Sequence, residues 1–327
     1  DFTASVAYVG NKGTRLLSRT APLNALNPAL LSHYGSRLYD EFQPGQSSLD
    51  GVAAPYAGWA QQMTACAPSV AQALLPYPQY CGPLQGLNEN AGNSTYHSLQ
   101  LKAEKRLSNG LWFLASYTFS KLITDADNTQ PDALSYQALG GAISPFERQR
   151  NKGLALEDVP QTFSLAASYD LPFGRHKRWL SSNRFLDYVV GGWTVSSILR
   201  FSSGIPFYFR SSTCNIPGQF VESCIPGVLS GANPFAQSES GFDPAKPLFN
   251  VNAFEPAGNF NFYSGSGTRV TNLRAFGTKN QDLLFSKTIP LTERFSFEVR
   301  GEAFNLWNNH IFRNFTTDIA SPSFGMW

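Results

Sequence analysis

Residues 99–119 read LQLKAEKRL, SNG and LWFLASYTF, which is one alternating segment on each side of a short turn. In the first segment the leucines share one face, whereas Gln100, Lys102, Glu104 and Arg106 share the other. A period of two predicts β-strands, and the short polar turn predicts a hairpin. A soluble sandwich would bury the apolar face against a second sheet, whereas a membrane barrel would turn it toward lipid and the charged face toward a polar lumen.

The same alternation predicts seven strands, over residues 2–9, 95–107, 111–121, 162–171, 193–203, 280–289 and 295–306. In the last of them, Glu298, Arg300 and Glu302 share one face. Charges on one face suit a wet lumen with cross-strand ion pairs, and they fit a sandwich core badly because buried charges are costly unless fully paired. The side chains expected to face the lumen are Lys102, Glu104, Arg106, Glu298, Arg300 and Glu302.

The connections between these strands alternate between short and long. Short links at 108–110, 172–192 and 291–294 alternate with long ones at 11–94, 122–161 and 211–279. Long loops without structure argue against a compact soluble domain. They are typical of membrane barrels, which have short periplasmic turns and long extracellular loops. The predicted fold class is therefore an all-β, antiparallel transmembrane β-barrel, seen in part.

Composition agrees with a barrel and excludes other classes. Of the 327 residues, 14% are aromatic and only 15% are charged, against about a quarter charged in ordinary soluble domains. No apolar run is long enough for a membrane-spanning helix. The net charge is +2 and no basic block stands out, so we expect no nucleic-acid partner.

Aromatic residues gather near the ends of the expected strands. The groups are Tyr117 with Phe119, Phe173 with Trp179, Phe207 with Tyr208 and Phe209, and Phe304 with Trp307. Such positions match the aromatic girdles of membrane barrels, where rings lie at the level of the lipid headgroups. The alternative is ordinary β-propensity, which also enriches aromatic residues in strands.

Four cysteines fall as two local pairs, Cys66 with Cys81 and Cys214 with Cys224. Each pair lies in a polar, Pro- and Gly-rich connection. Paired loop cysteines fit an oxidising compartment such as the periplasm or the cell surface, although spacing alone does not fix connectivity and four free thiols are the alternative. Neither pair has zinc-finger spacing, so we expect no metal site.

No catalytic motif is present. The chain has no G-x-S-x-G elbow, no phosphate-binding loop and no paired zinc-binding histidines. We therefore expect no enzyme activity and no cofactor. The loop aromatics and arginines are the candidates for ligand binding, because rigid aromatic side chains supply contact area at low entropic cost: Tyr56, Trp59, Tyr77, Tyr80, Arg148 and Arg150. The alternative is that they only pack the loops.

Several segments resemble the TonB-dependent outer-membrane receptors of the Oar-like group. In chain order they are YVGNKGTRL (8–16), GNSTYHSLQ (92–100), EKR (104–106), ASYTFSK (115–121), DVP (158–160), YDLPFG (169–174), GGW (191–193), SGIPF (203–207), NQDLLFSK (280–287) and EAFNLWNN (302–309). They cover every expected strand in family order, whereas the long loops match poorly.

The resemblance implies that the chain is the C-terminal part of a barrel of about twenty-two strands in the bacterial outer membrane. It implies a plug domain, a signal peptide and a last strand outside this chain. The implied partners are the TonB complex through that plug, outer-membrane lipids and lipopolysaccharide, and an unknown bulky nutrient. An oligosaccharide, a peptide and a siderophore all stay open as the nutrient.

Two other functions are weighed against energised uptake. A surface-exposed adhesin or scaffold would be soluble without detergent, and the charged strand faces speak against it. A passive porin is disfavoured by the length of the loops.

Overall fold

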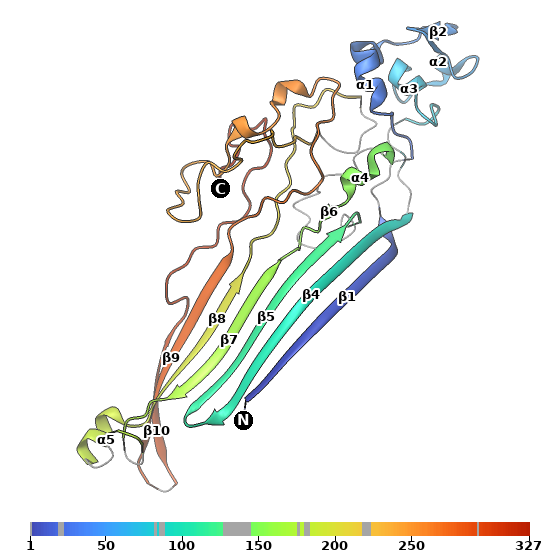
Figure 1. Cartoon of the computed structure of the whole chain (residues 1–327). Coiled ribbons are helices and arrows are strands. Elements are labelled where there is room, and N and C mark those ends of the chain that lie inside the picture. The colour runs from blue at the N-terminus through green and yellow to red at the C-terminus, as the bar shows by residue number, and fades with distance from the viewer. Residues whose placement is uncertain are drawn as a thin grey trace.

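The computed structural model describes residues 2–18, 23–81, 84, 89–126, 145–174, 177–179, 184–217, 224–292 and 294–327. Its main feature is one antiparallel sheet in which neighbouring strands follow each other along the chain (Figure 1). In sheet order the strands are β1 (Phe2–Ser18), β4 (Glu89–Ser108), β5 (Leu111–Thr124), β7 (Gln161–Asp170), β8 (Trp193–Ser202), β9 (Thr278–Pro290) and β10 (Ser296–Ala303). The short strand β6 (Gly153–Leu154) pairs with the end of β5. The predicted antiparallel all-β fold is confirmed.

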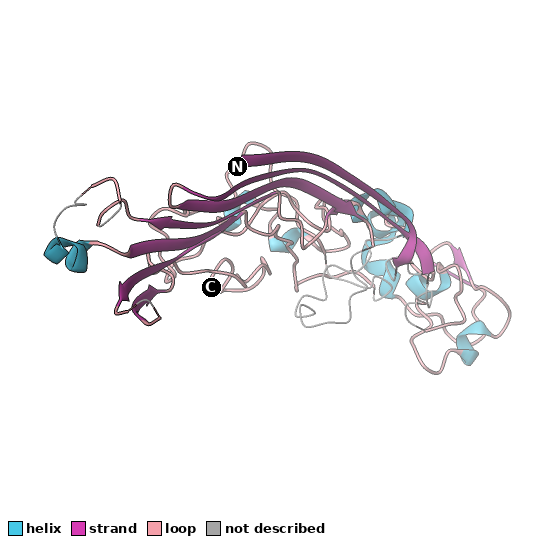
Figure 2. Cartoon of the chain, turned by 90° about the horizontal axis from the view of Figure 1, so that it is seen from below, coloured by secondary structure: helices cyan, strands magenta, loops and turns pink. Residues whose placement is uncertain are grey.

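The sheet is open rather than closed. Strands β1 and β10 form its two edges, and Figure 2 shows the strands bent into an arch. An edge strand leaves a row of backbone N–H and C=O groups without partners, which hydrocarbon does not tolerate. The open arch is consistent with one part of a larger barrel.

Short and long connections lie at opposite ends of the sheet (Figure 1). The β4–β5 hairpin turns at Asn109 and Gly110, which both have positive φ, 53° and 78°. Two successive positive φ values are the mark of a type I′ turn, which matches the twist of a hairpin. Helix α5 (Arg184–Val190) lies in the β7–β8 connection at the same end.

Two strands extend beyond the predicted bounds. Strands β1 and β4 stay paired from Gly10 with His97 to Thr14 with Asn93, and further irregular pairs follow. The sequence there is polar and has no alternation, so hydrophobic patterning alone misses it. Pairing in this region depends on backbone hydrogen bonds above the apolar part of the sheet.

The last strand is shorter than predicted. It ends at Ala303, although the alternation in the sequence continues to residue 306. Asn305 has a φ of 47°, and its backbone N–H donates to the Asp282 carboxylate at 2.9 Å. The left-handed residue and this side-chain acceptor turn the chain out of the ladder.

The connection after β1 folds into a first loop module, residues 23–81. It holds α1 (Ala29–Tyr34), the 3₁₀ helix η1 (Gly35–Tyr39), β2 (Ser48–Leu49), β3 (Val52–Ala53), α2 (Trp59–Gln62) and α3 (Val70–Ala73). Its buried core consists of Leu26, Leu31, Leu38, Phe42, Val52, Trp59, Met63, Val70, Ala71 and Leu75. This connection is thus a small folded unit and not a loop without structure.

A second loop module comprises residues 203–217, 224–277 and 304–327. It includes the 3₁₀ helices η4 (Val251–Ala253) and η5 (Ala257–Asn259). Its core is rich in phenylalanine and joins the β8–β9 connection to the C-terminal segment: Phe207, Phe209, Leu248, Phe249, Ala253, Phe254, Phe260, Ala275, Phe315, Ile319 and Phe324. The connection after β5 contributes the 3₁₀ helix η3 (Pro145–Glu147) and α4 (Arg148–Asn151).

This core corrects one expectation about the aromatic girdle. Phe207 and Phe209 are buried among other phenylalanines of the second loop module, so they do not lie at the lipid headgroups. By contrast, Phe119, Trp179 and Phe304 are largely exposed. In the described residues, no helix is both long and apolar enough to span a membrane.

Candidate functional site

The polar face of the sheet carries rows of polar side chains and a groove. Cross-strand pairing carries one row over four strands, from Lys102 to Ser116, Ser164 and Arg200. A groove of about 490 Å³ lies over this face. The polar residues that line it are Ser5, Gln100, Lys102, Ser116, Thr118, Ser164 and Arg200. Small hydroxyl groups dominate its centre, where the Ser116 and Ser164 Oγ atoms are 2.7 Å apart.

The structure places the predicted lumen-facing charges in two regions. Lys102 lines the groove, and its Nζ lies 3.2 Å from Glu104 Oε2. At the opposite edge of the sheet, on β10, Arg300 Nε lies 2.8 Å from Glu298 Oε1. Both ion pairs join residues of the same strand, whereas cross-strand pairs were expected.

Of the six predicted charges only Lys102 belongs to the groove lining, and the remaining two, Arg106 and Glu302, form neither of these ion pairs. Glu302 is opposite Leu284 on the edge strand β10. Arg106 lies within the register shift between Lys105 and Ser108. The extra residue of the shift separates Arg106 from the regular row that contains Lys102 and Glu104.

The opposite face of the sheet is apolar and exposed. Val6 pairs with Leu101, and Leu101 pairs with Tyr117, so apolar side chains form continuous rows across the strands. The large exposed side chains of this face include Phe2, Val6, Tyr8, Leu99, Leu101, Phe119, Tyr169, Phe201, Phe285, Phe297 and Val299. A surface this apolar requires a nonaqueous surrounding, and a polar groove behind it is the arrangement of a membrane barrel wall.

A family model described as an outer membrane beta barrel domain matches residues 1–327. The chain belongs to this family. It is therefore a β-barrel protein of the bacterial outer membrane. Searches of the curated proteins and of the solved structures find no match.

In the first loop module of the barrel, the segment from Tyr77 to Tyr80 is tightly anchored. Asn24 Nδ2 donates to the carbonyls of Tyr77 and Tyr80 at 3.1 and 3.3 Å. Gln72 Nε2 donates to Pro78 and Tyr80 at 2.9 and 2.8 Å. Asn24 and Gln72 are themselves buried. Because these buried side chains donate to main-chain carbonyls, they hold the segment in place. The side chains of Tyr77 and Tyr80 are nevertheless 47% and 51% exposed.

One of the predicted loop aromatics is wrong as a surface ligand contact. Trp59 is only 1% exposed. Its ring packs edge-on against Phe42 at 5.5 Å, and its Nε1 donates to the Pro78 carbonyl at 3.2 Å. Trp59 therefore packs the core that supports the tyrosine segment. Tyr56 is exposed, and its hydroxyl donates to Gln62.

The two predicted loop arginines differ. The Arg150 guanidinium donates to the carbonyls of Gly265 and Gly267 and to the side chains of Glu147 and Ser264. Its donors are thus engaged inside the protein, and Arg150 clamps α4 to the second loop module. Arg148 is exposed and makes a 3.3 Å bond to the Ala91 carbonyl, so it stays accessible.

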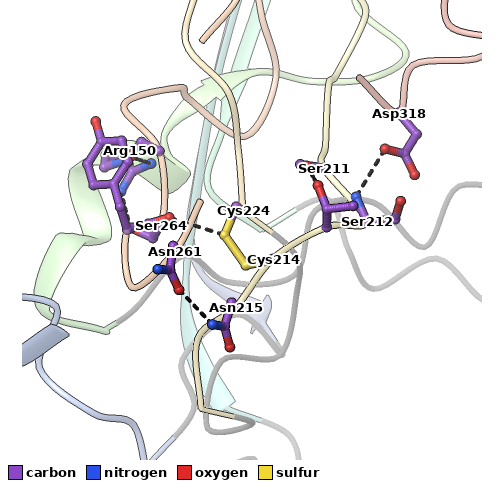
Figure 3. The surroundings of a disulfide bond; sticks show 12 residues. Arg150, Ser211, Ser212, Cys214, Asn215, Cys224, Asn261, Ser264 and Asp318 are labelled. Carbon is purple, nitrogen blue, oxygen red and sulfur yellow. Dashed lines mark hydrogen bonds between the residues drawn. A yellow bond between two sulfur atoms is a disulfide. The ribbon is translucent and has the colours of Figure 1, made fainter. Parts of the chain in front are cut away.

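The structure bonds Cys66 to Cys81 and Cys214 to Cys224, which are the two local pairs seen in the sequence. The first disulfide follows directly after the tyrosine segment. Around the second, Asn215 Nδ2 donates to Asn261 Oδ1 at 2.6 Å (Figure 3). All four cysteines thus strengthen loop modules and none is free.

Patterning missed two arginines, one that lines the groove and one that joins two loop segments. Arg200 lines the groove, but Ile198 interrupts the polar alternation of its strand. Arg269 is buried and donates to the Asn151 carbonyl at 3.1 Å, which joins the second loop module to α4. Burial lowers the pKa of Arg269 to about 10, and the charge of Asp125 opposes this shift. No local sequence signal marks such a long-range contact.

Proposed function

We propose that the chain is the C-terminal barrel part of a TonB-dependent receptor that imports a bulky nutrient. The observation that carries this proposal is the pair of folded, disulfide-bonded loop modules at one end of a sheet with a polar face. Passive pores need a wall and a constriction, whereas a receptor also needs folded surfaces that grip a ligand before transport. The ordered resemblance of the strand segments to Oar-like receptors supports the same assignment.

In the proposed mechanism, the loop modules capture the nutrient outside the cell. The TonB complex then pulls on a plug that lies outside this chain, and it uses the proton-motive force of the inner membrane. The groove residues Lys102 and Arg200, with the serine hydroxyls between them, contact the plug or line the path that opens.

The binding surface favours an uncharged ligand among the three classes left open. Residues 51–81 contain no Asp, Glu, Lys or Arg, although they carry Tyr56, Tyr77 and Tyr80. A peptide or a siderophore carries charges that need partners at the binding surface. Aromatic rings and amide side chains instead suit the apolar faces and hydroxyls of an oligosaccharide. We therefore place an oligosaccharide first.

Uptake in living cells tests this proposal. Cells lacking the gene, cells lacking TonB and wild-type cells are compared for uptake of fluorescent neutral oligosaccharides, peptides and ferric siderophores. We expect both mutants to lose uptake of the same oligosaccharides. Uptake that needs the gene but not TonB would establish a passive pore and overturn the proposal.

A matched pair of variants then tests the loop surface. Tyr77→Ala with Tyr80→Ala removes the two anchored rings, and we expect uptake to fall about 10-fold or more because each ring contributes roughly 1 kcal/mol of contact. Tyr188→Ala removes an exposed tyrosine of α5 at the opposite end of the sheet. Equal uptake by both variants would exclude Tyr77 and Tyr80 from ligand capture.

The second candidate is a surface adhesin or scaffold. The folded, disulfide-bonded loop modules favour it, since such modules also serve as stable binding surfaces. It predicts that cells lacking the gene lose adhesion while uptake of every tested nutrient is unchanged.

A further inference from the structure

Three basic side chains gather on the apolar face of the sheet, at the end that carries the long loops. Lys12 lies on β1, His97 on β4 and Lys121 on β5. They point outward because side chains alternate along a strand, and they share the parity of the outward-facing Tyr8 and Phe119. All three are exposed.

The strand register brings these three side chains together. His97 is directly opposite Lys121. Lys12 is opposite Thr95, one outward position along from His97 on the same strand. Lys12 and Lys121 are therefore separated by two strand spacings across the sheet and two residues along it, roughly 12 Å between backbones, with the imidazole between them. The long lysine side chains are able to converge on one anionic group there.

The two ammonium groups lack negative partners in the part of the chain that the structure describes. Lys12 Nζ donates only to the Thr95 hydroxyl, at 3.1 Å. His97 Nδ1 is 2.6 Å from the Tyr8 hydroxyl, which orients the ring. Two other lysines of this face are engaged more fully. Lys279 pairs with Glu239 at 2.7 Å, and Lys287 donates to the carbonyls of Val189 and Gly191.

The cluster lies where the apolar surface ends. The next outward residues toward the short turns are Tyr8, which is 69% exposed, and Phe119, which is 52% exposed. Leu99 lies between them in the same row, and below this row the surface continues with Val6 and Leu101. Exposed aromatics above an apolar band mark the level of the lipid headgroups. Because long loops lie outside the cell, this is the headgroup level of the outer leaflet.

We propose that Lys12, His97 and Lys121 bind a phosphate group of lipopolysaccharide. Unpaired cations at the headgroup level attract anionic lipid headgroups, and the acyl chains would lie along Tyr8, Phe119 and the aliphatic side chains below. The charge complementarity and the continuous apolar surface select a lipid as the occupant of this face. The inference concerns the outside of the barrel and does not depend on the proposed transport.

Lipid retained by the purified protein measures this binding. The full-length protein is extracted from outer membranes in detergent, and lipid A phosphate and phospholipid are quantified per molecule. We expect Lys12→Gln with Lys121→Gln to bind lipopolysaccharide roughly 10- to 30-fold more weakly, as the loss of two cations near a lipid surface implies. Lys12→Arg with Lys121→Arg keeps both charges and should retain wild-type binding.

The matched control is Lys102→Gln with Lys105→Gln, which removes one lysine of the polar face and one from the opposite end of the apolar face. It should bind lipopolysaccharide as the wild type does. Wild-type binding by the Lys12→Gln, Lys121→Gln protein would overturn the proposal. So would a loss confined to phospholipid, because the phosphate would then come from another lipid.

A second measurement keeps the test decisive if the double variant does not assemble. Wild-type protein is mixed with lipopolysaccharide whose lipid A phosphates have been removed. Weaker retention of the dephosphorylated lipid supports the site. Equal retention of both forms would show that phosphate is not recognised and would contradict the proposal.

Discussion

Phe262 of the second loop module lies in the hydrophobic core of the first, where its ring is 5.7 Å from the ring of Tyr39. The Tyr39 hydroxyl donates to Asn215 Oδ1 at 3.0 Å, and the Phe262 backbone N–H donates to the Asn215 carbonyl at 2.8 Å. The φ of Phe262 is 59°, a conformation that bulky residues rarely adopt. One aromatic side chain thus joins two modules that are far apart in sequence.

We predict that Phe262→Ala uncouples the loop modules. Removal of a buried phenylalanine ring costs about 3–5 kcal/mol, and here that cost falls on the contact between modules. Hydrogen exchange should accelerate at Leu38 and Val52, whereas the strands should be unaffected. Tyr263→Ala removes a neighbouring exposed ring and serves as the control. Equal exchange in wild type and Phe262→Ala would contradict the joining role.

The second loop module should lose stability in acid through Glu255. Burial raises the pKa of Glu255, but the backbone N–H groups of Gly227 and Ser266, at 2.8 and 3.0 Å, outweigh this and lower it below its usual value. A lowered pKa means stability that is present above the usual pKa of about 4.3 and is lost as pH falls through the lower native value.

Thermal unfolding between pH 3 and pH 7 measures this effect. We expect wild type to lose stability below about pH 4, whereas Glu255→Gln should be less stable at pH 7 and change less with pH. Glu239→Gln alters an exposed ion pair and should keep the wild-type profile. A wild-type profile in Glu255→Gln would show that this carboxylate does not stabilise the module.

The Cys66–Cys81 disulfide should stabilise the first loop module. It closes a loop with a sequence separation of 15, for which chain entropy gives about 3 kcal/mol. Cys66→Ser with Cys81→Ser should therefore make the tyrosine segment sensitive to chymotrypsin after Tyr80, whereas Pro78 protects the bond after Tyr77 in every variant. Cys214→Ser with Cys224→Ser leaves that segment bonded and is the control. Equal cleavage rates in both variants would contradict a local role.

Hydrophobic patterning predicts the sheet well, because the side chains of each strand alternate between two faces with different surroundings. Leu99 lies on the apolar face and Lys102 in the groove of the polar face, and the chemical nature of each side chain indicates its face. The first loop module follows no such period, because Trp59 and Phe42 meet through tertiary packing. The burial of Trp59 could therefore not be predicted from the sequence. Packing of the loop by its own aromatic residues was one of the two alternatives.

The second loop module is harder still to predict. Phe207 and Phe249 meet at 4.9 Å across a long insertion, and Phe315 joins them from the C-terminal segment. Sequence proximity to a strand end makes Phe207 look like a girdle residue. Only the three-dimensional path of the chain shows that it lies inside a folded module.

In the membrane, we expect the polar face of the sheet to line a water-filled lumen while the apolar face lies in lipid. Ser116 lines the groove, and Ala115, the preceding residue of β5, points to the opposite face between Ala103 and Leu165. The direct measurement is labelling of Ser116→Cys and Ala115→Cys in the full-length protein in outer membranes. A water-soluble maleimide should modify Ser116→Cys only, and a lipid-soluble maleimide should modify Ala115→Cys. Water-soluble labelling of Ala115→Cys with protection of Ser116→Cys would contradict the account.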